Sequence, residues 1–104
     1  MTDKYEPVID QYFHHKGRHQ KVWKFPNGYG VSLIRGVETR SGTELWTLAV
    51  LKYHGGGALE FDLCYDTDIT PHKDVILNLK DEEVDVLVDA VAMLSPALDA
   101  HLPN

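Results

Sequence analysis

The feature that most constrains the fold of this chain is a pair of β-prone runs joined by a short turn. The first run ends at Phe25 and the second begins at Tyr29, with Pro26, Asn27 and Gly28 between them. An Asn-Gly pair readily supplies the positive-φ positions of a tight hairpin turn, and proline is tolerated where no ladder N–H is needed. The pattern therefore predicts strands over 20–25 and 29–35, joined as a β-hairpin.

Two later runs extend the predicted sheet. The run 43–53 is apolar on both sides at its centre, which is typical of an inner strand. In the run 59–65 we expect the odd-numbered side chains to face the core and the even-numbered ones, from Glu60 to Cys64 and on to Asp66, to face outward. The run 75–79 fits either a helical turn or a further strand. Short connections between these strands favour an antiparallel meander of three to four strands.

Helical periodicity appears at both ends of the chain. Apolar residues at helical spacing predict an amino-terminal helix over 2–15 that ends before Gly17: Tyr5, Val8, Ile9, Tyr12 and Phe13. A second helix is predicted from Asp81 to Leu94, because acidic residues in its first turn suit the positive end of the helix dipole. The fold class is thus α+β, an antiparallel meander with an N-terminal helix and a C-terminal helix packed on the sheet.

The length of 104 residues predicts a single α+β domain over 1–104, with its core at about 20–94. The lone Cys64 excludes an intramolecular disulfide. The amino terminus lacks the pattern of a signal peptide, and no run approaches the length of a membrane span. These features predict a cytoplasmic protein with no membrane contact.

The charge of the chain is distributed unevenly. Residues 1–59 carry eight Lys and Arg against five Asp and Glu, whereas residues 60–104 carry two Lys against eleven acids. Such an asymmetry can steer a basic partner to the acidic half, although acidic residues can also merely solvate a helix and a strand. The predicted partner surface comprises Glu60, Asp62, Asp66, Asp68, Asp81, Glu82 and Asp85.

Several segments resemble a family of small uncharacterised proteins encoded by bacteriophages and prophages of Gram-positive bacteria. The resemblance covers roughly residues 20–94 and depends on the motifs Trp23 to Gly30, Arg35-Gly36, Leu45 to Val50, Tyr65 to Thr67 and Asp81 to Leu94. It implies a phage or prophage accessory protein in the cytoplasm of a host bacterial cell, and it assigns no active site. Together with the acidic residues, it favours a non-enzymatic protein that binds a host or phage protein, for example to inhibit a host defence protein.

Two other functions remain open. The segment 16–29 interleaves cations with aromatic rings, as single-strand binders do, and could form a nucleic-acid surface from Lys16, Arg18, Lys21, Trp23, Lys24 and Tyr29. The uneven charge could also support a self-associating virion component. The oligomeric state is not predicted.

No residue pattern in the chain predicts a catalytic, cofactor or metal site. His15 and His19 are four residues apart, but Gly17 lies between them and no third ligand follows. Asp66 and Asp68 are too few for a calcium loop. Cys64, expected on the outer face between acidic residues, is a poor nucleophile because like charge disfavours its thiolate. We therefore do not expect an enzyme.

Overall fold

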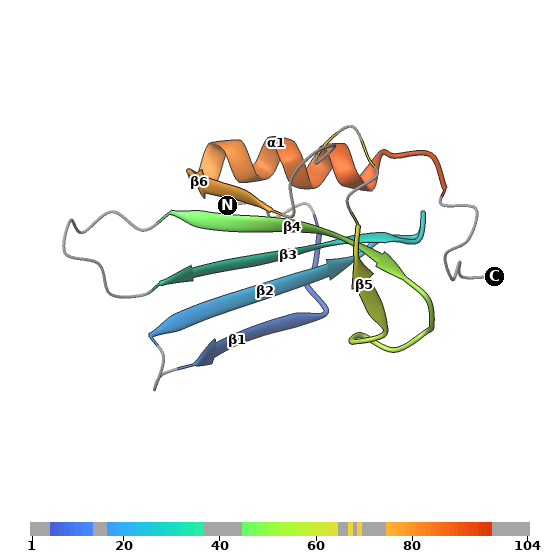
Figure 1. Cartoon of the computed structure of the whole chain (residues 1–104), viewed down its shortest axis with the longest axis horizontal. Coiled ribbons are helices and arrows are strands. Elements are labelled where there is room, and N and C mark those ends of the chain that lie inside the picture. The colour runs from blue at the N-terminus through green and yellow to red at the C-terminus, as the bar shows by residue number, and fades with distance from the viewer. Residues whose placement is uncertain are drawn as a thin grey trace.

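The computed structural model describes residues 5–13, 17–36, 45–64, 67, 69 and 75–96. They form an α+β fold of six antiparallel strands and one helix (Figure 1). The elements are β1 (Ile9–Phe13), β2 (Arg18–Lys24), β3 (Tyr29–Gly36), β4 (Trp46–Tyr53), β5 (Phe61–Leu63), β6 (Ile76–Leu79) and α1 (Asp81–Ala92). The sheet order is β1-β2-β3-β4-β5, and β6 also pairs with β4.

The hairpin predicted around Asn27 is confirmed as β2–β3. The strands pair from Arg18 opposite Gly36 to Lys24 opposite Gly30. The N–H of Gly28 donates to the carbonyl oxygen of Phe25 at 3.2 Å, and Gly28 has φ 88°. Glycine adopts this left-handed conformation without the penalty that a Cβ atom would impose. Gly28 therefore forms the turn that sets the pairing register of β2 with β3.

The main core lies between α1 and one face of the sheet. Figure 1 shows α1 running across β3 and β4, with β1 and β2 farther away. Its buried face consists of Val84, Val88 and Val91, at the spacing of one helix side. These valines pack with side chains that β2, β3 and β4 direct to the same face: Trp23, Val31, Leu33, Trp46, Leu48 and Val50. The predicted C-terminal helix on the sheet is confirmed.

A smaller cluster occupies the opposite face of the sheet. Val22, Leu51 and Tyr53 are fully buried there, and Ile9 and Phe61 pack against them. No helix covers this face among the described residues. Alternate side chains of β2 and β4 therefore supply two unequal apolar clusters, one on each side of the sheet.

The prediction of an amino-terminal helix is wrong for the residues that the structure describes. Ile9–Phe13 form strand β1, which pairs antiparallel with β2 from Ile9 opposite Val22 to Phe13 opposite Arg18. Valine, isoleucine and aromatic residues favour strands as well, and β2 offers backbone partners that a short isolated helix lacks. Gly17, expected to end the helix, has φ 59° immediately before β2. His14, His15 and Lys16 lie outside the described residues.

The prediction that the odd-numbered side chains of the run 59–65 face the core is also wrong. Leu59 and Leu63 are 73% and 48% exposed, whereas Cys64 is 3% exposed and belongs to the main core. Strand β5 pairs only with the end of β4, from Leu51 opposite Leu63 to Tyr53 opposite Phe61. Its odd-numbered side chains therefore share the face of Leu51 and Tyr53, which offers only the small cluster. Tyr65 and Asp66 lie outside the described residues.

Strand β6 resolves the ambiguity of the run 75–79 in favour of a strand. Trp46 pairs with Leu79 and Leu48 with Ile76, so β6 carries one residue more than β4 over the same span. Asn78 absorbs the bulge with φ 61°, a conformation that asparagine tolerates better than most residues. No helix among the described residues is long and apolar enough to span a membrane.

Side chains from the sheet hold both ends of α1. The Asn27 amide Nδ2 donates to the carbonyl oxygens of Val91, Ala92 and Leu94 at 2.9, 3.2 and 3.0 Å. The last carbonyls of a helix lack the usual intrahelical partners, so this amide supplies them with a side-chain donor. The Val91 carbonyl also accepts the N–H of Leu94 at 3.2 Å. At the other end, the Trp46 indole Nε1 donates to Asp81 Oδ1 at 2.8 Å. The hairpin turn and β4 thus fix the position of the helix.

Replacing Asn27 by alanine should destabilise the fold, because the carbonyls of Val91, Ala92 and Leu94 at the end of α1 lose a side-chain donor. We expect the free energy of unfolding to fall by about 2–3 kcal/mol, measured by urea denaturation. The exposed Gln11 serves as a control, since Gln11→Ala should change stability by only about 0.5 kcal/mol. Equal stability of Asn27→Ala and wild type would contradict the capping role.

Candidate partner-binding surface

An apolar groove with acidic residues at its edge lies beside the start of α1. It has a volume of about 450 Å³ and is lined by Leu79 of β6 and by Glu82, Glu83, Val86 and Leu87 of α1. Leu79 is 5% exposed and lies deep, whereas Val86 is 68% exposed. A contiguous apolar hollow rimmed by polar side chains is a surface at which another molecule can bind, whereas a single exposed apolar residue is ordinary.

The exposed apolar surface of α1 continues beyond this groove. Met93, which follows the last helical residue, is 75% exposed. Residues seven apart lie on one side of an α-helix, so Val86 and Met93 share an outer side. The helix buries one valine face in the core and presents a second apolar side to solvent.

Local hydrogen bonds fix the first turn of α1. The N–H of Lys80 donates to Glu83 Oε1 at 3.1 Å, and Asp81 accepts the Trp46 indole N–H. Three acidic residues, Asp81, Glu82 and Glu83, occupy this turn, where the positive end of the helix dipole favours negative charge. Asp81 and Glu83 therefore serve the fold as well as the surface.

The structure separates the predicted acidic surface into two groups. Asp81, Glu82 and Asp85 lie on α1, whose start adjoins β6 beside Trp46, whereas Asp62 of β5 pairs opposite Lys52 near the other end of β4 (Figure 1). Six residues of an extended strand separate Trp46 from Lys52, which corresponds to about 20 Å. The acidic residues of the two strand ends therefore do not form one continuous patch.

The individual environments of these carboxylates also differ. Glu60 and Asp62 are exposed, and Asp62 Oδ2 lies 3.9 Å from His54 Nε2. Asp85 is half-buried, and its Oδ1 atom has no hydrogen-bond partner among the described residues. Asp66 and Asp68 lie outside the described residues. Of the predicted acidic residues that the structure describes, Glu82 on α1 lines the apolar groove.

The described side chains of the predicted nucleic-acid segment, residues 16–29, do not form one surface either. Trp23 is 1% exposed, and its indole donates to the backbone oxygen of Tyr5 at 3.1 Å. Tyr29 is half-buried against the main core. Trp23 therefore offers no open face on which a base could stack, as single-strand binding requires, and Tyr29 is partly covered. Arg18 is exposed, and Lys16 lies outside the described residues.

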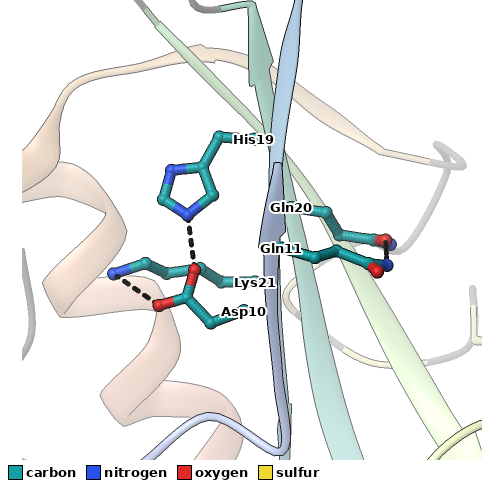
Figure 2. Close-up of polar contacts among 5 residues, drawn as sticks. All are labelled: Asp10, Gln11, His19, Gln20 and Lys21. Carbon is teal, nitrogen blue, oxygen red and sulfur yellow. Dashed lines mark hydrogen bonds and ion pairs between the residues drawn. The ribbon is translucent and has the colours of Figure 1, made fainter. Parts of the chain in front are cut away.

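The two described lysines of this segment face opposite sides of β2. Lys21 Nζ lies 3.9 Å from Asp10 Oδ2, on the side that carries α1 (Figure 2). Lys24 Nζ donates to the backbone oxygens of Gly55 and Gly56 at 3.2 and 2.9 Å, over the ring of Tyr53. Alternation along the strand thus sends the two ammonium groups apart.

A polar network on β1 and β2 was not predicted from the sequence. Figure 2 shows Asp10 contacting His19 and Lys21 on one side of the sheet, and Gln11 bonded to Gln20 on the other. His19 Nε2 lies 2.6 Å from Asp10 Oδ1, and His19 is 4% exposed. Only the strand pairing of residues 9–13 with 18–22 reveals that these side chains meet.

The same register brings three rings and a guanidinium from four strands into contact. The rings of Tyr12 and His19 stack with centroids 4.0 Å apart, His19 lies 5.6 Å from Trp46, and the Arg35 guanidinium lies 4.5 Å from the centre of the Trp46 ring. The sequence places His19 four residues after His15, the spacing of two candidate metal ligands. His15 lies outside the described residues, and the described ones contain no cluster of three or more His, Cys, Asp or Glu that could hold a metal ion.

Comparison with known proteins identifies no relative. No family model, no curated protein and no solved structure matches the chain. The assignment of function therefore depends on the chemistry of the residues themselves.

Tyr53 of β4 provides a pH-dependent test of the smaller apolar cluster, which lies on the sheet face opposite α1. Burial raises the pKa of the Tyr53 phenol above its ordinary value of 10.0, and the hydroxyl donates to the backbone oxygen of Ala58 at 3.0 Å. Because the folded state holds this proton more tightly, the resulting stabilisation is present below the unfolded pKa and is lost as pH rises through the folded one.

We expect Tyr53→Phe to lose less stability than wild type between about pH 9 and 11, measured by urea denaturation, because the phenol no longer titrates. Tyr12, which is 53% exposed, provides the control, since Tyr12→Phe should retain the wild-type alkaline loss. Identical alkaline profiles of wild type and Tyr53→Phe would contradict the assignment.

Proposed function

We propose that this protein acts by binding another protein through the groove beside the start of α1. The observation that carries the proposal is the combination of an exposed apolar side chain, Val86, with two carboxylates, Glu82 and Glu83, around one hollow. Apolar contact supplies affinity, and carboxylates at the edge attract a partner of positive charge and exclude an acidic one.

The proposed partner is a basic protein. The resemblance of residues 20–94 to phage and prophage proteins leads us to propose a host or phage protein in the cytoplasm of a bacterial cell, with inhibition of a host defence protein as one outcome. We propose binding, not catalysis, as the means of action. The sequence predicted a partner surface of seven acidic residues. Because the groove lies beside α1, we restrict the proposed surface to the acidic residues of α1 around Glu82.

Nucleic-acid binding by the segment 16–29 has weaker support. The two rings that would stack on bases, Trp23 and Tyr29, both pack in the main core. Lys24 is engaged with the carbonyls of Gly55 and Gly56 on the far side of the sheet.

The groove is tested by capture from a bacterial lysate with the immobilised chain and two matched variants. Val86→Lys places a cation in the groove without disturbing the core, because Val86 is 68% exposed. Leu59→Lys makes the same change at an equally exposed residue, 73%, outside the groove. We expect a specific protein that wild type and Leu59→Lys retain and that Val86→Lys loses by about tenfold or more.

Equal capture of that protein by all three forms would contradict the groove as the binding surface. Circular dichroism and urea denaturation of both variants establish that each is folded, so that a loss of capture reports on binding.

A further inference from the structure

We propose that the occupant of this groove is an amphipathic helix of the partner protein, with basic side chains over Glu82 and Glu83 and apolar side chains over Val86 and Met93. This inference rests on the proposed function and specifies its partner. Three observations support it: the spacing of the exposed apolar side chains on α1, the position of the acidic residues along α1, and the features of the edge strands that disfavour pairing with another strand.

The exposed apolar side chains lie along one side of α1. From Val86 to Met93, the residue that directly follows the helix, they span about 10 Å or two helical turns. Val86 and Met93 lie seven residues apart, with the half-buried Ala90 between them at four residues from Val86. Side chains at this spacing form a ridge beside which a second helix packs its own ridge.

The charges along α1 give the contact a direction. Asp81, Glu82 and Glu83 occupy the first turn, and the last turn carries no basic residue. A partner helix therefore gains the strongest electrostatic attraction when its basic residues lie at the β6 end of the groove. An antiparallel pair of two α1 helices lacks this attraction, because the acidic turn of each would lie beside the end of the other, which carries Asp89 and no basic residue.

The sheet edges disfavour an extended peptide. At one edge, β6 contains a bulge, with Asn78 at φ 61°. At the other edge, β1 follows Pro7 and carries Asp10, whose carboxylate contacts His19 and Lys21 across the sheet face. Bulges, prolines and inward-facing charges are the features by which edge strands avoid pairing with another strand.

The probe is a pair of displayed peptide libraries of about fifteen residues, selected on the immobilised full-length chain and counter-selected on Val86→Lys. One library presents random residues on the outer face of a stable helix, and the other presents them in a linear segment rich in β-branched residues, which favour an extended strand. We expect binders from the helical library only, with apolar residues at i, i+4 and i+7 and Lys or Arg in one terminal turn.

The best helical binder is then titrated into the ¹⁵N-labelled chain. We expect shifts of the amide signals of Val86, Leu87 and Met93, and a two- to tenfold weaker affinity for Glu82→Gln that also depends less on salt. The Asp62→Asn variant, which removes a carboxylate at the far end of β4, should bind as wild type does.

Binders that come from the extended library, or helical binders without a basic turn, would overturn the proposed occupant. The failure of the helical library to yield a binder that Val86→Lys rejects would overturn it too. Concentration-dependent dimerisation that Val86→Lys abolishes would identify a second copy as the occupant and would also overturn it. If lysate capture still depends on Val86 in any of these cases, the binding function stands and only the helical partner fails.

Discussion

The attachment of α1 to the sheet at both ends is the interaction on which the rest of this structure depends. The amide of Asn27 satisfies three carbonyls at the end of the helix, while its Oδ1 atom accepts the N–H of Tyr29 within its own turn. One side chain thus couples the hairpin to the helix. At the other end, Trp46 and Asp81 connect β4 to the first helical turn. The helix can neither slide nor rotate without breaking one of these contacts.

This fixed orientation determines which side of α1 faces solvent. The valines at 84, 88 and 91 are committed to the core, so Val86 and Met93 remain outside. Leaving large apolar side chains in water forgoes roughly 1.5–3 kcal/mol each relative to burial. The acidic first turn has a structural reason in the helix dipole and in the bond from Lys80 to Glu83. The exposed Val86 and Met93 have no such reason within the fold, and the partner proposed above would supply one.

The sequence predicted the parts of the fold that local rules govern, and failed where distant pairing decides. The Asn27-Gly28 turn and the valine spacing of α1 are local signals, and both elements form as expected. Tyr5 to Phe13 fit a helix and a strand equally well, and only pairing with β2 selects the strand. The alternation from Leu59 to Cys64 was read correctly as a strand, but its inner face was misassigned because two unequal clusters flank the sheet. For the candidate site, the acidic start of α1 was predicted, whereas the groove was not, because it depends on β6 lying beside the helix.

Native-state hydrogen exchange tests the attachment of α1 most directly. If both ends hold the helix to the sheet, the amides of Val84, Val88 and Val91 should exchange with the same opening free energy as those of Val31 and Leu33 in β3, within about 1 kcal/mol. Exchange of the helix amides at an opening free energy several kcal/mol lower would show that α1 opens independently of the sheet, and would contradict the account.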